Sequence, residues 1–529
     1  MLIFVPMAGF GDRYLRAGFK EPKPLIPVDG RAMIERVVEC FPGEERFLFC
    51  VNATHAKTTN VLDVLRHLKP SAPVVITEPH KDGPIRTLLA CEEHIDPEEE
   101  VVLNYCDFGV DWDYQAWKSW LAKGWDGAMS GYRGFHPHSL GPTLYAYMRS
   151  EGDNVLEIRE KHHFTDNKFN EYASSGLYYF RRGRALLEAA KKLVLRGERV
   201  NDEFYVSMAM QLLIEQGGKV GVYPLKHFYQ WGTPEDLRDY EGWARAMRRL
   251  DGFYDTMRKT RSPAVHVIPM AGRGQRFAER GYPDPKPLIQ TAGAPMIAQS
   301  LACLPTPSKR ILVALREHAE DARFKAVVAR LHGDTRVIAL DGVTEGQACT
   351  AELGLAGAAD DEPVLFAPCD TGYVFDEQRL AAMERDFDLI VFAAKGHLPA
   401  LWRPHMYGWL TAGADGRVER VAVKKLVDGV PAMEQQVVTG TFWFKDVATF
   451  RREFAALTAD NDRVNGEFYI DTIARRMVEA GKRVAAFTVD KYVPWGTPEE
   501  LQTFDYWNEV FRQGRPLGVG GADASVTTA

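Results

Sequence analysis

Short apolar runs separated by polar and glycine-rich segments recur along this chain and predict alternating strands and helices. Leu2–Pro6 and Val265–Pro269 are continuous apolar runs that lead directly into glycines. Such runs are typical of strands buried on both faces of a sheet. Further strands are expected at Arg46–Val51, Val101–Asn104, Arg310–Ala314 and Val364–Ala367, and helices at Ile34–Cys40 and Thr87–His94.

This alternation predicts an α/β fold with a mostly parallel central sheet. Ligands of such sheets bind at the carboxyl ends of the strands. Asp107 and Asp370, each preceded by a cysteine, follow the third strand of each half. A glycine loop follows the first strand of each half, so loop and aspartate are expected at one edge of the sheet.

The two halves repeat one another. Residues 6–34 and 269–297 align without a gap and share 15 of 29 residues. The correspondence continues to a late Trp-Gly-Thr-Pro-Glu, at residues 231–235 and 495–499. A period this long indicates a duplicated domain, because solenoid units are only about 20–50 residues long. We expect domains at residues 1–257 and 264–515, a linker at 258–263 and a disordered tail at 516–529.

Composition narrows the class of protein. The net charge of −7 gives no electrostatic reason to expect nucleic acid or an anionic membrane as partner. No apolar run approaches the length of a membrane span, and the apolar start Met1–Pro6 is expected to be a buried strand, not a signal peptide. The seven cysteines lack metal-binding spacing. Together these features favour a cytoplasmic protein with reduced thiols.

The first repeated loop contains the residue types that hold phosphate. Gly9 and Gly11 let the backbone approach a phosphate closely, and Arg13 can contact its oxygens with two N–H groups. A tight strand–helix turn is the competing interpretation of such a loop. Lys23 follows between two prolines, which stiffen its segment. The same arrangement recurs in the second half, which favours phosphate binding over a solvated surface lysine.

These motifs resemble the signature of sugar-phosphate nucleotidyltransferases, the nucleotide-sugar pyrophosphorylases. The shared features are G-x-G-x-R-[FY], P-K-P-L-I, a glycine-containing base loop, the aspartate and the late W-G-T-P-E. The variant P-M-A-G-x-G-x-R-[FY] is similar to enzymes of capsule and surface-polysaccharide pathways. The resemblance covers nearly all of each half. It implies a GT-A-like, Rossmann-type fold and the reaction of a nucleoside triphosphate (NTP) with a sugar 1-phosphate, which releases pyrophosphate.

By position, the resemblance implies a role for residues of both halves. Arg13 and Arg276 would hold the β- and γ-phosphates, and Lys23 and Lys286 the reacting phosphate. Asp107 and Asp370 would bind Mg²⁺, and Lys161 and Lys424 the phosphate of the incoming sugar phosphate. Nucleotide-binding positions would be Gly9, Gly11, Gly272 and Gly274 in the loops and Gly83 and Gly346 against the base, with Glu160 on the sugar hydroxyls.

The chain departs from this pattern at the second metal ligand. Members of the family carry a carboxylate two residues before the late Gly-Thr, where this chain has Gln230 and Pro494. Glu203 and Glu467 could substitute, as could Asp202 in the first half. They could equally be acids at a helix N-terminus.

The halves also differ from one another. The second half has Val423 where the first has Glu160, so a sugar contact is missing there. The base loop is altered in the first half, where Lys81-Asp82-Gly83-Pro84-Ile85 replaces the family-like Thr344-Glu345-Gly346-Gln347-Ala348. The copies therefore either use different substrates or include one inactive copy. We expect nucleotide binding in both.

Other residues of chemical interest receive structural interpretations. His136, His138, His162 and His163 are not repeated in the second half, and surface or pocket-lining positions are expected for them. The aromatic stripe at Trp112–Trp120 is expected in the core.

Several functions fit these features. The leading prediction is a tandem nucleotidyltransferase that uses Mg²⁺, a sugar phosphate or related small phosphate, and CTP or UTP, with dTTP next. One half could instead be a regulatory pseudo-domain, the protein could be a nucleotide-sugar sensor, or it could be a GT-A glycosyltransferase. The D-x-D motif of glycosyltransferases is missing after both aspartates. A homo-oligomer is possible.

Overall fold

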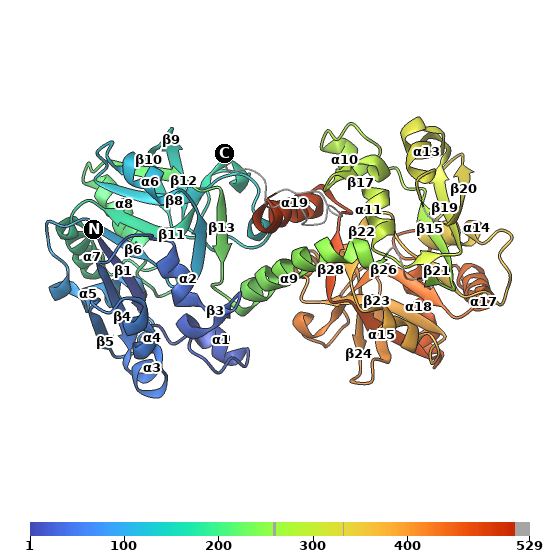
Figure 1. The fold of residues 1–529 in the computed structure, drawn as a ribbon, viewed down its shortest axis with the longest axis horizontal. Coiled ribbons are helices and arrows are strands. Elements are labelled where there is room, and N and C mark those ends of the chain that lie inside the picture. The colour runs from blue at the N-terminus through green and yellow to red at the C-terminus, as the bar shows by residue number, and fades with distance from the viewer. Residues whose placement is uncertain (258–260, 332, 514–529) are drawn as a thin grey trace. The chain divides into compact units, whose positions relative to one another are not determined.

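The computed structural model describes residues 1–257, 261–331 and 333–513, and for 251–257 it describes the backbone alone. The chain divides into two compact units, residues 1–241 and 242–529 (Figure 1). The division lies inside helix α9 (Pro234–Met257). Trp243 comes just after this division and belongs to the second unit, where it packs on Trp507. Residues 258–260, half of the expected linker, and the whole expected tail lie outside the described residues.

The central sheet of unit 1 has nine strands in the order β5-β4-β1-β6-β11-β8-β12-β10-β9. Within its first seven strands, only β11 runs against the others. The expected α/β fold with a mostly parallel sheet is confirmed. The strands are β1 (Leu2–Met7), β4 (Phe47–Asn52), β5 (Val74–Thr77), β6 (Val101–Asn104), β8 (Gly127–Tyr132), β9 (Tyr147–Glu151), β10 (Asn154–Arg159), β11 (Tyr172–Phe180) and β12 (Val220–Pro224).

Helices cover both faces of this sheet, and strand β1 shows why. Leu2 and Phe4 join one core with helices α5, α7 and α8, whereas Ile3 and Val5 join another with α2, α4 and α6. Both faces of β1 are therefore apolar, which explains its continuous apolar run. The helices are α1 (Asp12–Arg16), α2 (Met33–Glu39), α3 (Ala53–Thr58), α4 (Val61–Leu68), α5 (Pro84–Leu89), α6 (Tyr114–Leu121), α7 (Gly183–Arg196) and α8 (Val206–Glu215).

Unit 2 repeats this architecture. Its sheet has the order β20-β19-β15-β21-β26-β23-β27, extended by the β24–β25 hairpin, and β26 is the reversed strand. The strands are β15 (Val265–Met270), β19 (Lys309–Leu315), β20 (Asp334–Leu340), β21 (Val364–Phe366), β23 (Leu389–Lys395), β24 (Gly408–Ala412), β25 (Val418–Ala422), β26 (Gln436–Phe444) and β27 (Val484–Thr488). The helices used below are α10 (Gln275–Glu279), α14 (Gln347–Gly354), α18 (Ile470–Glu479) and α19 (Pro498–Arg512).

Two sequence expectations need comment. The helix expected at Thr87–His94 begins earlier, at Pro84, and ends at Leu89; a separate 3₁₀ turn covers Glu92–His94. The proline fits the first turn of a helix, where its missing N–H costs nothing. The aromatic stripe lies in the core as expected, since Trp117 and Trp120 are buried. Within the described ranges, no helix is long and apolar enough to cross a membrane.

Candidate functional site

The glycine loop turns the chain from strand β1 into the short helix α1. Gly11 adopts a φ of 70°, a left-handed conformation that favours glycine. A Cβ on Gly11 would lie 3.8 Å from the Cβ of Lys23, so loop and lysine approach closely. Gly274 in unit 2 has a φ of 64° and a still closer approach, 2.9 Å, to Lys286. The repeated glycines therefore let the loop lie close to the lysine in both units.

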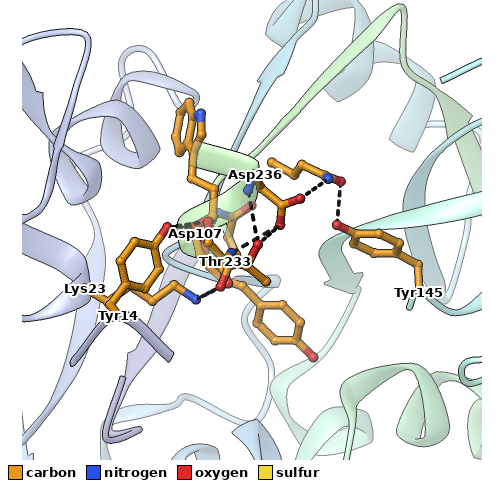
Figure 2. A network of polar contacts seen from close by, with 11 residues as sticks. Tyr14, Lys23, Asp107, Tyr145, Thr233 and Asp236 are labelled. Carbon is orange, nitrogen blue, oxygen red and sulfur yellow. Dashed lines mark hydrogen bonds and ion pairs between the residues drawn. The ribbon is translucent and has the colours of Figure 1, made fainter. Parts of the chain in front are cut away.

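Lys23 lies beside the aspartate that follows strand β6. Its Nζ is 2.5 Å from Oδ2 of Asp107 and donates to the carbonyl of Gly232 at 3.1 Å (Figure 2). The side chains of Lys23 and Asp107 remain 20% and 25% exposed, so both can reach a ligand. Lys286 and Asp370 form the same ion pair in unit 2. The structure thus brings together two groups separated by 84 residues in each half.

All the site residues expected in unit 1 line one cavity of about 610 Å³. A cavity of this size is large enough for a small-molecule ligand. The cavity lies at the edge of the sheet where β1 and β6 end, since residues 6–9 and 105–107 line it. The expected residues that line it are Gly9, Gly11, Arg13, Lys23, Gly83, Asp107, Glu160 and Lys161.

Asp236, which the sequence reasoning missed, also lines this cavity. Its carboxylate accepts from the hydroxyl of Thr233 at 2.7 Å and from the side-chain amide of Gln230 at 2.7 Å. Gln230 in turn accepts from the hydroxyl of Tyr145 at 2.6 Å, and Figure 2 shows Asp236 between this pair and Thr233. Burial raises the pKa of Asp236 to about 6, against the opposing effect of Thr233.

Asp236 also faces Asp107. A Cβ added to Gly232 would lie 3.4 Å from Oδ2 of Asp107 and 4.0 Å from Oδ2 of Asp236. The two carboxylates therefore flank one small residue. Unit 2 repeats this arrangement over Gly496, with 3.2 Å to Asp370 and 3.1 Å to Glu500. The sequence signal was the acid that follows W-G-T-P-E in both copies.

Glu160 and Lys161 lie on another wall of the cavity. Lys161 adopts a φ of 56°, and its Nζ donates to the hydroxyl of Tyr205 at 2.5 Å. The Glu160 carboxylate accepts from the hydroxyl of Ser207 at 2.5 Å. Burial raises the pKa of Glu160 to about 7, against the lowering effects of Ser207 and Lys161. An acidic group and a cation thus stand side by side, as hydroxyl and phosphate binding would require.

Gly83 has a local structural reason to be glycine. Its φ is 90°, and a Cβ there would lie 2.7 Å from the carbonyl oxygen of Phe204. Gly346 in unit 2 is tighter still, at 2.5 Å from the backbone of Phe468. Both glycines therefore let the start of helix α5 or α14 pack against a distant backbone segment.

The corresponding groups of unit 2 form one electrostatic cluster. Lys424 has a φ of 58°, and its Nζ donates to the carbonyl of Met406 at 2.7 Å. Burial lowers the pKa of Lys424, and the charge of Arg276 acts in the same direction. Burial raises the pKa of Tyr407, and the charge of Arg276 opposes this rise. The hydroxyl of Tyr407 donates to the carboxylate of Glu500 at 2.5 Å. Strand pairing makes Tyr407 the counterpart of Tyr145.

The two residues of unit 1 that the sequence offered as alternative metal ligands differ in whether they line the cavity. Glu203 lines the cavity and precedes helix α8, outside its first turn. Asp202 is exposed and does not line the cavity. Among the described residues, no group of three or more His, Cys, Asp or Glu side chains is arranged to hold a metal.

The expected surface or pocket-lining position was wrong for His136 and His138. His136 and His138 are buried, contact one another, and lie among Tyr132, Tyr145 and Phe228, so they belong to the protein interior. Burial lowers the pKa of His136 to about 4, which keeps its ring neutral. His162, by contrast, is exposed.

The MobA-like NTP transferase domain model matches residues 4–150 and 266–430, which is more than half of the chain. The chain belongs to this family. The expected resemblance to nucleotidyltransferases is confirmed, and the chain is a member of an enzyme family that acts on NTPs. Each matched range includes the glycine loop, the lysine and the aspartate of one unit, so both units carry the NTP transferase domain.

Curated relatives include the Bifunctional protein GlmU of Bacillus cereus strain G9842, 24% identical over 229 residues, or 43% of this chain and 47% of the relative. That of Bacillus mycoides strain KBAB4 is 22% identical over 227 residues. The chain thus spans about half the length of the curated relatives it matches.

Among solved structures, a nucleoside-diphosphate-sugar pyrophosphorylase from Vibrio cholerae RC9 is 21% identical, with a TM-score of 0.38 over 45% of this chain and 98% of that one. An inositol-1-phosphate CTP transferase from T. maritima is 17% identical, with a TM-score of 0.37 over 45% of this chain and 93% of that one.

Proposed function

We propose that each NTP transferase unit transfers a nucleotidyl group from an NTP to a sugar phosphate or a related small phosphate, with release of pyrophosphate. The observation that carries this proposal is the Lys–Asp pair beside a glycine loop and an arginine, present in both units. The activated sugar would serve as a precursor of surface polysaccharide. We place the two domains at residues 1–257 and 264–515.

The chemistry requires alignment and charge neutralisation more than covalent catalysis. The acceptor phosphate oxygen attacks the α-phosphorus, and pyrophosphate leaves. In unit 1, Arg13 would hold the departing phosphates, Lys23 the reacting phosphate and Lys161 the acceptor phosphate. Arg276, Lys286 and Lys424 would do the same in unit 2. The partly buried position of Lys23 and Lys286 strengthens their interaction with the charge that develops.

The carboxylates of each unit fit a magnesium ion. Mg²⁺ is bound by one or two carboxylates together with phosphate oxygens and waters. In unit 1, Asp107 and Asp236 face one another over Gly232, and in unit 2 Asp370 and Glu500 do so over Gly496. We assign the second metal ligand to Asp236 and Glu500. When bound, the ion would neutralise charge on the NTP phosphates.

The base and the acceptor follow from the family resemblance. We propose CTP or UTP as the nucleotide and a polyhydroxylated phosphate as the acceptor. Glu160 supports the acceptor assignment, because it places an acidic group beside Lys161 within the cavity. Such a group can accept hydrogen bonds from sugar hydroxyls while the lysine binds the phosphate.

The test is pyrophosphate release by the full chain with Mg²⁺, each of CTP, UTP, dTTP, ATP and GTP, and a panel of hexose 1-phosphates and inositol 1-phosphate. We expect release that requires one base and one acceptor, and its loss in the double variant Lys23→Ala/Lys286→Ala. Lys57→Ala, which changes a lysine outside the lining of the cavity, is the control. Release without an acceptor, or release that survives the double variant, would contradict the proposal.

A further inference from the structure

Unit 2 lacks the acidic side chain that unit 1 places beside its lysine. Val423 precedes Lys424 where Glu160 precedes Lys161. In unit 1 the partner of Glu160 is Ser207, on helix α8. The counterpart of Ser207 in unit 2 is Asp471, on helix α18. The acid therefore comes from helix α18 in unit 2, whereas in unit 1 it precedes the lysine.

Asp471 is positioned beside Lys424 and is withdrawn from water. It is only 9% exposed, and it interacts electrostatically with Lys424. In the part of the chain that the structure describes, no side chain donates a hydrogen bond to its carboxylate. The partners of this carboxylate are the charge of Lys424 and its own backbone N–H, so its oxygens can still accept hydrogen bonds from the hydroxyl groups of a ligand.

A third replacement makes room for this carboxylate. Oδ2 of Asp471 lies against Gly408, so close that a Cβ on that residue would clash with it. Strand pairing places Gly408 opposite Val438, and the equivalent position of unit 1 is Ala146. Unit 2 thus has a glycine in place of the alanine of unit 1, next to an aspartate that is larger than the serine of unit 1.

Three positions change together between two copies of one site. Unit 1 combines Glu160 and Ser207 with Ala146, and unit 2 combines a valine and an aspartate with a glycine. The glycine makes room for the aspartate whatever its role, but an acid that only stabilised the start of helix α18 would not be accompanied by the loss of Glu160. The combination preserves one acidic group beside the lysine of each unit.

We propose that Asp471 binds the hydroxyl groups of the acceptor in unit 2, in the role that Glu160 has in unit 1. This inference rests on the proposed function. Because the acid approaches from helix α18, it meets a different side of the acceptor than Glu160 does. The two units are therefore expected to prefer acceptor phosphates that differ in the position or orientation of their hydroxyl groups.

The test uses the full chain with Lys23→Ala and Lys161→Ala, which remove the lysines proposed for the reacting phosphate and the acceptor phosphate of unit 1, so that acceptor binding reports on unit 2. Binding of the panel of hexose 1-phosphates and inositol 1-phosphate is measured by calorimetry with a non-hydrolysable NTP analogue present. We expect Asp471→Asn to weaken the preferred acceptor about ten- to a hundredfold, the effect of losing hydrogen bonds to a charged group. Binding of the NTP analogue alone, and of inorganic phosphate, which lacks carbon-borne hydroxyls, should change little.

A residue exchange gives the matched control. Val423→Glu combined with Asp471→Ser and Gly408→Ala recreates the residues of unit 1, and it should restore acceptor binding with the preference of unit 1. Unchanged acceptor affinity in Asp471→Asn would overturn the inference. So would acceptor binding that is missing from unit 2 altogether while the NTP analogue still binds. Loss of both the analogue and the acceptor in the Lys23→Ala/Lys161→Ala chain would instead contradict the proposed function of unit 2.

Discussion

The two units place the same charges at their sites but take some of them from different positions. The glycine loop, the arginine and the Lys–Asp pair are identical in kind. The acid beside the second lysine is Glu160 in one unit and Asp471 in the other. The comparison teaches that the groups we propose for the reacting phosphate are the same in both units, whereas the acid we propose for the acceptor comes from a different element in each.

The second proposed metal ligand shows the same compensation. In unit 1, Tyr145 reaches Asp236 through Gln230. In unit 2, Pro494 replaces the glutamine and can supply no side-chain hydrogen bond. Glu500 is one methylene longer than Asp236, and it accepts directly from Tyr407. The longer side chain of Glu500 thus reaches its tyrosine directly, without the glutamine that connects Tyr145 to Asp236 in unit 1.

The largest expected effect comes from the part that the two units share. Lys23→Ala and Lys286→Ala should each reduce nucleotidyl transfer by its own unit about 10²–10³-fold, the cost of removing one group that stabilises the charge of the transition state. The measurement is kcat for pyrophosphate release with each base and acceptor. If either single variant abolished the activity of both units, the units would not be separate catalysts.

The second prediction concerns the acids that differ between the units. Asp236→Asn and Glu500→Gln should each raise the Mg²⁺ concentration for half-maximal rate about 10–100-fold, since each removes a proposed metal ligand. The rate is titrated with Mg²⁺ in backgrounds where the other unit is silenced. Glu235→Gln, beside Asp236 but outside the lining of the cavity, is the control. An unchanged requirement for Mg²⁺ would limit both acids to holding the helix start.

A smaller effect is expected from the glycine that packs on Phe204. Gly83→Ala should lower the stability of unit 1 by about 1–3 kcal/mol, because the added Cβ would clash with backbone atoms. Gly18→Ala is the matched control, since Gly18 has a φ of 85° and open space around it. Thermal unfolding of the two variants separates the clash from backbone strain. Equal destabilisation would contradict the close approach.

The smallest effect is the pH dependence that Glu160 gives to unit 1. Burial raises the pKa of Glu160 to about 7 from a usual value of 4.5, so the folded state holds this proton more tightly than the unfolded state. Its contribution to stability is therefore present below pH 4.5 and is lost as the pH rises towards 7. Glu160→Gln should gain thermal stability relative to the parent at pH 8 more than at pH 5.

A neighbouring acid should respond in the opposite direction. Desolvation alone would raise the pKa of Glu157, but hydrogen bonds and charge from Arg159 and Arg149 lower this pKa below its usual value. Glu157→Gln should therefore lose stability relative to the parent at pH 8 more than at low pH. Parallel pH profiles for the two variants would refute the assigned cause.

The repeat and the apolar runs were enough to predict the fold, because buried strands and glycine turns are local signals. They also predicted which residues line the cavity of unit 1, since duplication distinguishes Arg13 and Lys23 from chance. Asp236 was missed because its role depends on how close the start of α9 lies to Asp107. Asp471 was missed because a residue aligned with a serine gives no sign of replacing a glutamate elsewhere.

The most direct test of the account is the number of nucleotide sites per chain. Calorimetric titration of the full chain with a non-hydrolysable analogue of the active NTP, in Mg²⁺, should give two sites. Lys23→Ala and Lys286→Ala should each remove or weaken one of them, and the double variant both. A single site that only one of these substitutions affects would show that one unit has lost nucleotide binding and would contradict the claim that both sites are preserved.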